Sequence, residues 1–337
     1  MKKKYIIIGL IIISILILIV KVWGHNNISK QLSTSHITQS LPSSPSYVFV
    51  KKWGSIGNED GQFVNPRHIA IDKSDNIYTS DHNNGRIQKF DSEGNFILKW
   101  NIGVAVEGIT IDFRGYVYAG GNYQIQKFDS QGNFILKWGN NGVGEGQFDQ
   151  VSSIASDPNG YIYVIDNSVF FYKNPNELRG RIQKFDSNGN FIFQCKFLAD
   201  LFNGIAIDPM GKIFLGFSEG RIYINKYKSL EDIYKDGYFK DTYWGKAEWT
   251  FPKRERGKIF KSRLNLATDK EGNLFALDIS GCVYKIDSTG KILTKWGSSG
   301  SGDGEFNQPK AIAVDSKGNV YVMDTGNYRI QKFSPVP

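Results

Sequence analysis

The chain has 337 residues, with 41 Lys and Arg against 33 Asp and Glu, which gives a formal net charge of +8. Seven lysines lie in residues 1–53, which hold no Asp, Glu or Arg, so residues 54–337 carry a net charge of only +1. A nearly neutral body lacks the broad basic surface that binds polyanions, and we therefore expect no nucleic-acid partner.

The N-terminal segment, residues 1–24, predicts a membrane anchor. An uncharged run extends from Tyr5 to Val20, with Lys2, Lys3 and Lys4 before it and Lys21 after it. Its 16 residues fall between the length of a signal-peptide core and that of a spanning helix. No small-x-small cleavage site follows, which favours an uncleaved anchor with the lysine cluster in the cytoplasm and the remainder outside.

Residues 25–46 predict a flexible polar stalk. This segment, HNNISKQLSTSHITQSLPSSPS, has no aromatic residue and is rich in Ser, Thr, Asn and Gln. Such a composition cannot bury a core. The expected organisation is therefore an anchor at 1–24, a stalk at 25–46 and a tethered domain at 47–337.

The domain at 47–337 is built from a repeated unit. Each unit has a strand ending in Asp, a D-x-x-G/D turn, a second strand, a third strand of RIQKF type, a DSxGN turn and a fourth strand of FILKW type. The first strands are HIAID (68–72), GITID (108–112), SIASD (153–157), GIAID (204–208), NLATD (265–269) and AIAVD (311–315). Six four-stranded units with a period of about 40 residues predict a six-bladed, all-β propeller.

The first and last strands of this domain predict how the ring closes. The sixth unit stops after its third strand, at RIQKF (329–333), whereas YVFVKKW (47–53) is a fourth strand with no unit before it. Pairing the two would remove both open sheet edges, so we expect residues 47–53 to complete the last blade.

The units resemble NHL repeats, most clearly in residues 57–90 and 300–333. The resemblance covers nearly all of 47–337 and is weakest in the fourth unit, at 221–245. It implies a six-bladed propeller. NHL-repeat proteins include RNA-binding and ubiquitin-ligase modules, a peptide-amidating lyase, sensor domains and relatives of lactonases, so the resemblance implies the fold far more firmly than the function.

Several chemistries of that family find little support in the residues. A zinc-dependent lyase needs converging histidines, and this domain has only His68 and His82. His82 is interpreted as a turn residue. The glycine-rich loops at 54–63, 139–148 and 297–306 join strands and open no helix, which argues against phosphate binding. Cys195 and Cys282 are interpreted as small buried residues, so we expect neither a cofactor nor a metal.

A comparison between units predicts structural ion pairs. The second strand ends in Asp and the third begins with Arg in units one, three and six, whereas unit two has neither. Unit four keeps only Arg221 and unit five only Asp278. The two either pair across the boundary between their units or remain available to a ligand.

Candidate ligand-binding residues come from the starts of the first strands and from two insertions. The first strands of a propeller surround the channel, and the starts of these strands define what we call its top face. Aromatic residues and Arg in loops are typical of interfaces. The candidates are Arg67, His68, Glu107, Asn203 and Lys310 at the strand starts, Arg221 and Asp278, Phe171 and Tyr172 in the insertion 167–180, and Trp249 and Arg254 in the insertion 246–262.

The sequence therefore predicts a membrane-tethered, extracytoplasmic propeller that binds a protein, peptide or glycan through its top face. The alternative is a lactonase- or lyase-like enzyme with a metal ion in the central channel, for which Glu107, Asn203 and Asn265 would have to converge.

Overall fold

The computed structural model describes residues 47–121, 123–167, 180–197, 201–218, 222–234, 247–251, 260 and 263–336. The predicted anchor and stalk, residues 1–46, and most of the two insertions lie outside these ranges. Within the described ranges, no helix has the length and apolar character needed to cross a membrane.

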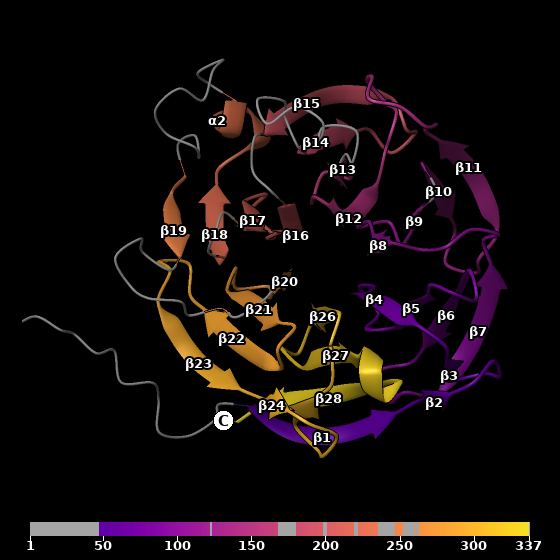
Figure 1. Ribbon diagram of the computed structural model, residues 1–337, viewed down its shortest axis with the longest axis vertical. Helices are drawn as coiled ribbons and strands as arrows, with labels where there is room; N and C mark the ends of the chain where they lie inside the picture. Colours follow the sequence, from indigo (N-terminus) through magenta and orange to yellow (C-terminus); the bar gives the residue numbers. More distant parts are fainter. Residues whose placement is uncertain are drawn as a thin grey trace, which may run out of the picture. The chain divides into compact units, whose positions relative to one another are not determined.

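The described residues form six four-stranded antiparallel sheets, or blades, arranged in a ring (Figure 1). Blade 1 consists of β4 (Pro66–Ile71), β5 (Ile77–Asp81), β6 (Arg86–Phe90) and β7 (Phe96–Asn101). Blade 2 consists of β8 (Gly108–Ile111), β9 (Val117–Gly121), β10 (Gln124–Phe128) and β11 (Phe134–Trp138). Blade 3 consists of β12 (Val151–Ser156), β13 (Ile162–Asn167), β14 (Gly180–Phe185) and β15 (Phe191–Phe197). Blade 4 consists of β16 (Leu201–Ile207), β17 (Ile213–Ser218), β18 (Ile222–Tyr227) and β19 (Trp249–Phe251). Blade 5 consists of β20 (Leu264–Thr268), β21 (Leu274–Asp278), β22 (Cys282–Ile286) and β23 (Ile292–Trp296). Blade 6 consists of β26 (Ala311–Val314), β27 (Val320–Asp324), β28 (Arg329–Pro335) and β1 (Tyr47–Trp53).

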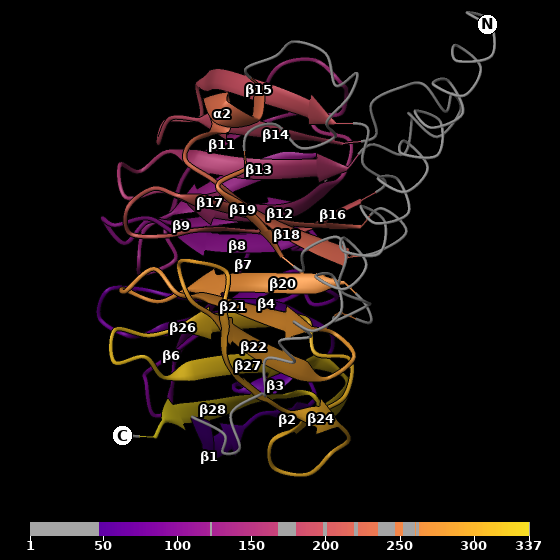
Figure 2. The same ribbon diagram turned by 90° about the vertical axis from the view of Figure 1, so that its left-hand side faces the viewer.

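Short elements connect the blades. The strands β2 (Ser55–Ile56) and β3 (Gln62–Phe63) pair in parallel, as do β24 (Ser298–Ser299) and β25 (Glu305–Phe306). A five-residue helix, α2 (Leu230–Tyr234), follows β18, and a 3-10 turn, η2 (Thr325–Asn327), follows β27. The side view in Figure 2 shows the blades from the edge of the ring.

The ring closes as the sequence predicts. β1 pairs antiparallel with β28, with Phe49 opposite Phe333 and Trp53 opposite Ile330, and Figure 1 shows the two strands side by side at the rim. Tyr47, which begins β1, stacks on Trp296 of blade 5 with ring centroids 4.4 Å apart. The first strand of the propeller thus completes the last blade and also packs against the blade before it.

Each blade packs on the next through aromatic rings. Phe63, Phe148 and Phe306 of the glycine-rich loops are fully buried in the cores between blades. At the outer edge, Trp100 of blade 1 covers Gly132 in the β10–β11 turn of blade 2, where an added Cβ would lie 2.7 Å from the indole. This contact recurs between blade 6 and blade 1, where Trp53 covers Gly94.

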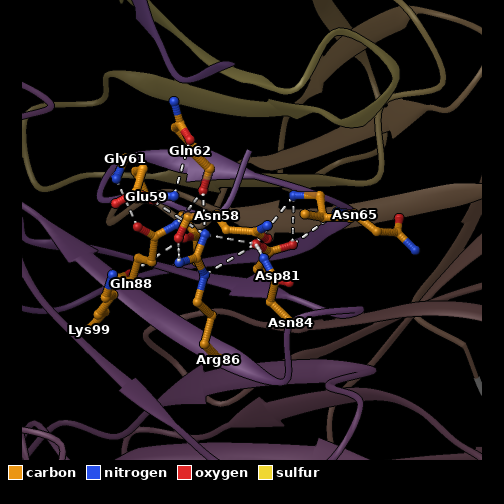
Figure 3. A network of polar contacts seen from close by, with 12 residues as sticks. Asn58, Glu59, Gly61, Gln62, Asn65, Asp81, Asn84, Arg86, Gln88 and Lys99 are labelled. Atoms are coloured by element: carbon orange, nitrogen blue, oxygen red, sulfur yellow. Dashed lines mark hydrogen bonds and ion pairs between the residues drawn. The ribbon is translucent and has the colours of Figure 1, made fainter. Parts of the chain in front are cut away.

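The predicted Asp–Arg pairs are present, and they anchor the glycine-rich loops. Asp81 and Arg86 lie 3.2 Å apart with both side chains buried. Arg86 also donates to the carbonyl oxygen of Gln62, at 2.8 Å, and Gln88 donates to the same oxygen at 2.8 Å. The side-chain oxygen of Gln88 accepts from the backbone of Gly61 at 2.9 Å. Figure 3 shows how these side chains hold the loop that leads into blade 1.

The same arrangement recurs in blades 3 and 6, where Asp166 pairs with Arg181 at 2.8 Å and Asp324 with Arg329 at 2.7 Å. Blade 2 lacks the pair because its connecting loop takes the space. A Cβ atom on Gly121 would lie only 1.8 Å from the carbonyl oxygen of Ala105. The shared loss of Asp and Arg in unit two therefore reflects a different loop.

Candidate functional site: the mouth of the central channel

The candidate site is a polar cavity of about 210 Å³ at the starts of the inner strands, which are the first strands of the blades and surround the channel. We call it the channel mouth, and it is lined by Arg67, His68, Glu107, Gln150, Val151, Ser152, Asn167, Arg263, Leu264, Asn265, Ile279 and Lys310. A second cavity of about 230 Å³ shares His68 and Asn265 with it and continues along the inner strands. The two cavities together mark the central channel.

A three-residue polar cluster spans blades 1 and 2 at the mouth. Glu107, which precedes β8, forms an ion pair with Arg67 of β4 through its Oε2 atom. Its Oε1 atom lies 2.7 Å from Nε2 of His82, which follows β5. Burial tends to raise the pKa of Glu107, but Arg67 and His82 outweigh this effect and hold the pKa below its ordinary value. Glu107 is therefore a carboxylate at neutral pH.

His68 lies beside this cluster as a neutral imidazole. Burial lowers its pKa from 6.5 to about 4, the carboxylate of Glu107 opposes the shift, and the positive charges of Arg67 and Lys310 add to it. Its backbone N–H donates to the hydroxyl of Ser80 at 3.0 Å. At neutral pH, His68 can thus donate or accept a hydrogen bond but adds no charge to the mouth.

Two further cations lie on the other side of the mouth. Lys310 precedes β26 and Arg263 precedes β20, and both side chains are exposed. The pKa of Lys310 is lowered, first by partial burial and then by the charges of Arg67 and Arg263, with an opposing contribution from Glu107. The mouth is therefore electropositive on this side.

Blade 3 supplies neutral polar groups. The side-chain amide of Asn167 donates to the hydroxyl of Ser152 at 2.9 Å, and Gln150 lines the same wall. The backbone N–H of Gln150 is held by Asp166 at 2.7 Å, so the buried Asp166–Arg181 pair also orients this wall.

The structure brings four of the predicted site residues together, namely Arg67, His68, Glu107 and Lys310. Asn203 lies in β16, but its side chain is outside the described part of the structure, as are Arg221, Phe171, Tyr172 and Arg254. The predictions made for these five residues remain predictions.

Two predicted residues lie away from the mouth. Trp249 belongs to β19, the outer strand of blade 4, where its Nε1 donates to the carbonyl oxygen of Ser288 at 3.0 Å and its ring packs on Phe214. Its placement in an inserted loop was wrong, because the degenerate fourth unit obscured this strand. A role of Trp249 in ligand binding stays a prediction. Asp278 is 1% exposed and accepts from the backbone of Ser280 at 2.9 Å, so its carboxylate does not line the cavity.

Sequence reasoning missed His82, Arg263, Gln150 and Asn167. His82 was interpreted as a turn residue, yet it reaches Glu107 of the next blade. A signal for the ion pair was present, since Arg67 and Glu107 hold equivalent positions in successive units. No comparable signal marked Arg263, which follows the insertion 246–262.

Among the described residues, no three His, Cys, Asp or Glu side chains are grouped so that they could hold a metal ion. Asn265 lines the mouth with Glu107, but its Oδ1 accepts from the backbone of Ile312 at 3.2 Å. Cys195 and Cys282 do not form a disulfide; Cys195 is buried, as predicted, whereas Cys282 is partly exposed.

Solved structures with a similar fold cover most of the chain. A gluconolactonase from Xanthomonas campestris aligns with a TM-score of 0.57 at 13% identity, covering 90% of this chain and 94% of that one. The PQQ-bound aldose sugar dehydrogenase of Streptomyces coelicolor aligns with a TM-score of 0.57 at 12% identity, covering 88% and 99%. At this level of identity the likeness shows the fold alone, and it agrees with the blades described above: the domain is a six-bladed β-propeller.

Sequence comparisons identify the type of repeat. The model of the NHL repeat matches residues 63–90 and 306–333. NHL repeat-containing protein 3 of Homo sapiens is 32% identical over 78 residues, which are 22% of this chain and 22% of that protein. Protein lin-41 of Caenorhabditis elegans is 42% identical over 66 residues, 16% of this chain and 6% of that protein. The chain thus matches only a small part of these relatives, and two of its units, at 63–90 and 306–333, match the NHL repeat.

Proposed function

We propose that this protein is a binding module that holds a protein, peptide or glycan ligand at the channel mouth. The observation that carries the proposal is the concave, polar cavity, in which charged and hydrogen-bonding side chains from blades 1, 2, 3, 5 and 6 converge. Binding sites in proteins are typically concave, with a few polar groups that fix the ligand's orientation. A rigid ring positions such groups more precisely than separate loops would.

We further propose that the propeller is tethered to a membrane by residues 1–24 and faces the extracytoplasmic side. The support is the apolar run from Tyr5 to Val20 between lysines and the near-neutral charge of the rest of the chain. Protease added to intact, right-side-out membranes should remove the propeller and leave a short membrane-bound N-terminal fragment. A propeller that is recovered in the soluble fraction, or that is protected until the membrane is lysed, would contradict this arrangement.

The binding role can be tested in cells with the full chain. Lys310 at the mouth is replaced by the photo-crosslinking amino acid p-benzoylphenylalanine, and Lys317, in an exposed turn at the other end of β26, is replaced in a matched control. Light-dependent adducts should form at position 310 and be absent or much weaker at 317. Equal adducts from both positions, or none from either, would count against a ligand at the channel mouth.

A second candidate is a lactonase- or lyase-like enzyme with a metal ion in the channel. The observation in its favour is the shared fold with a gluconolactonase over 90% of the chain. Purified full-length protein would be assayed for sugar-lactone hydrolysis with and without added divalent metal. Metal-dependent turnover that is lost in Glu107→Gln would support this candidate over the binding role.

A further inference from the structure

The channel mouth holds more positive than negative charge. Arg67, Arg263 and Lys310 line it, and Glu107 is the single carboxylate among the described residues that do so. Both carboxylate oxygens of Glu107 are engaged, one by Arg67 and the other by His82. Residues of blade 1 therefore pair with the negative charge of Glu107.

Lys310 and Arg263 are left without a carboxylate. Within the part of the chain that the structure describes, neither side chain forms an ion pair or a hydrogen bond. Partial burial lowers the pKa of Lys310, and repulsion from the charges of Arg67 and Arg263 lowers it further. A bound anion would relieve that repulsion, because an opposite charge favours the charged form of each cation.

Hydrogen-bond donors are also available at the mouth. The Nε atom of Arg67 is buried and has no acceptor in the described structure, although the same guanidinium pairs with Glu107. Buried donors in folded proteins are nearly always satisfied, so an unsatisfied one at the wall of a cavity points to an acceptor supplied from outside. Oxyanions are the acceptors that guanidinium and ammonium groups bind most strongly.

The size and charge of the cavity restrict the anion. About 210 Å³ is less than the roughly 300 Å³ at which pockets for whole drug-sized ligands begin, and it suits one charged group with its neighbouring atoms. Glu107 faces the same space, but Arg67 and His82 engage both of its oxygens, which leaves Arg263 and Lys310 as the two groups that can bind the two oxygens of one carboxylate. The neutral wall of Ser152 and Asn167 can hydrogen-bond the polar atoms that flank such a group.

We propose that the channel mouth recognises a carboxylate group of its ligand, held between Lys310 and Arg263. This inference rests on the proposed binding function and specifies its ligand chemistry. The carboxylate can come from an acidic segment of a partner polypeptide or from a small free organic acid, and the two sources are separated by the probes described below.

The test measures fluorescence anisotropy with the full chain in detergent. The probe is a rhodamine-labelled peptide with the core Glu-Asp-Glu, and its matched control carries Gln-Asn-Gln. The double variant Lys310→Met with Arg263→Gln removes two charges at the mouth. The variant Lys73→Met with Lys317→Met removes two charges from exposed turns at the opposite ends of β4 and β26, so the net charge of the two proteins is equal.

The acidic peptide should bind at least tenfold more tightly than its amide control. The mouth variant should lose at least tenfold in affinity, whereas the opposite-face variant should stay within about twofold of the wild type. Equal losses in the two variants would mean that only bulk charge matters and would overturn the proposal. Equal binding of the acidic and amide peptides would also overturn it, as would failure of both the peptide and the small acids to bind.

Competition separates the sources of the group. Displacement of the labelled peptide by acetate or glucuronate assigns recognition to the carboxylate alone, and resistance to both assigns it to an acidic polypeptide; either result supports the proposal. Stronger displacement by inorganic phosphate than by these acids would overturn the preference for a carboxylate. Photo-adducts at position 310 without acidic-peptide binding would refute this inference and leave the binding function standing.

Discussion

Buried Asp–Arg pairs show how single residues hold this propeller together. Asp324 is fully buried, pairs with Arg329 at 2.7 Å and accepts from the backbone of Asn307 at 2.7 Å. Arg329 in turn donates to the carbonyl oxygens of Gly302 and Glu305 in the preceding loop. One ion pair therefore connects a strand end to a loop that has few apolar side chains of its own.

Removing one partner of such a pair should be costly. We expect Asp324→Ala to lower the free energy of unfolding by about 3–5 kcal/mol, because it leaves a buried guanidinium without its carboxylate. The matched control is Asp303→Ala in the same loop, whose pair with Lys52 is about half exposed and should contribute less than about 1 kcal/mol. Urea unfolding compares the two, and similar losses would show that the buried pair is not special.

His68 should make stability depend on pH. Its pKa is about 4 in the folded protein and 6.5 when unperturbed, so between these values the unfolded chain binds more protons. Stability from this group is fully present above pH 6.5 and is lost as the pH falls toward about 4, by roughly 2–3 kcal/mol. Urea unfolding across this range should show a shallower loss in His68→Asn. If the free energy of unfolding fell equally with pH in the wild type and in His68→Asn, the pH dependence would not come from His68.

At the scale of elements, the turns between third and fourth strands connect neighbouring blades. Gly132 in the β10–β11 turn has a φ of +82° and faces Trp100 of the preceding blade, and Lys89 of that blade donates to the carbonyl oxygen of Ser130 in the same turn at 3.2 Å. The Lys332 ammonium repeats this bond across the closure, to Ser92 at 2.9 Å. The repeated DSxGN sequence thus encodes a contact between blades as well as a turn.

Substitutions at two glycines of blade 2 distinguish the cost of backbone strain from the cost of crowding the tryptophan that packs on the turn. Gly132 and Gly115 have φ values of +82° and +87°, but an added Cβ at Gly115 meets nothing within 4 Å. Both Ala substitutions carry the strain of a positive φ, whereas only Gly132→Ala also crowds Trp100. Gly132→Ala should therefore lower the melting temperature further, by the equivalent of about 1–3 kcal/mol. Equal shifts would show that the indole moves aside without cost.

At the scale of the whole molecule, stability depends on a closed ring. β1 supplies the outer strand of blade 6, and its Tyr47 lies against both Trp296 and Phe275 of blade 5. Without β1, blade 6 would expose the edge of β28 and the core between the last two blades. An open sheet edge is both unstable and prone to aggregation.

Deleting residues 47–53 should therefore destabilise the entire propeller in one cooperative transition, as measured by thermal melting. Because that deletion can abolish folding, Tyr47→Ala provides a milder test, with an expected loss of about 3–5 kcal/mol. The neighbouring Val48 is 48% exposed, and Val48→Ala should change stability by less than about 0.5 kcal/mol. An unchanged melt after the deletion would refute closure by β1.

Much of the fold could be predicted from the sequence because each unit repeats the same local chemistry. The Asp at the end of each inner strand, the RIQKF strand and the partnerless YVFVKKW strand were enough to predict six blades and their closure. Blade 4 was not predicted in full because its outer strand has only three residues, Trp249–Phe251, and follows a stretch whose sequence departs from the repeat. The site was partly predictable, since Arg67 and Lys310 hold equivalent strand-start positions, but Arg263 carried no repeat signal.

The sequence by itself determined the repeat, the number of blades and the Asp–Arg pairing, because these depend on neighbours within a unit or on a pattern compared between units. Only the tertiary structure decided that His82, Glu107 and Arg67 meet, and that Lys310 and Arg263 face them without a carboxylate of their own. Such contacts join side chains that different blades contribute. Their geometry depends on the curvature of the closed ring, which no single unit encodes.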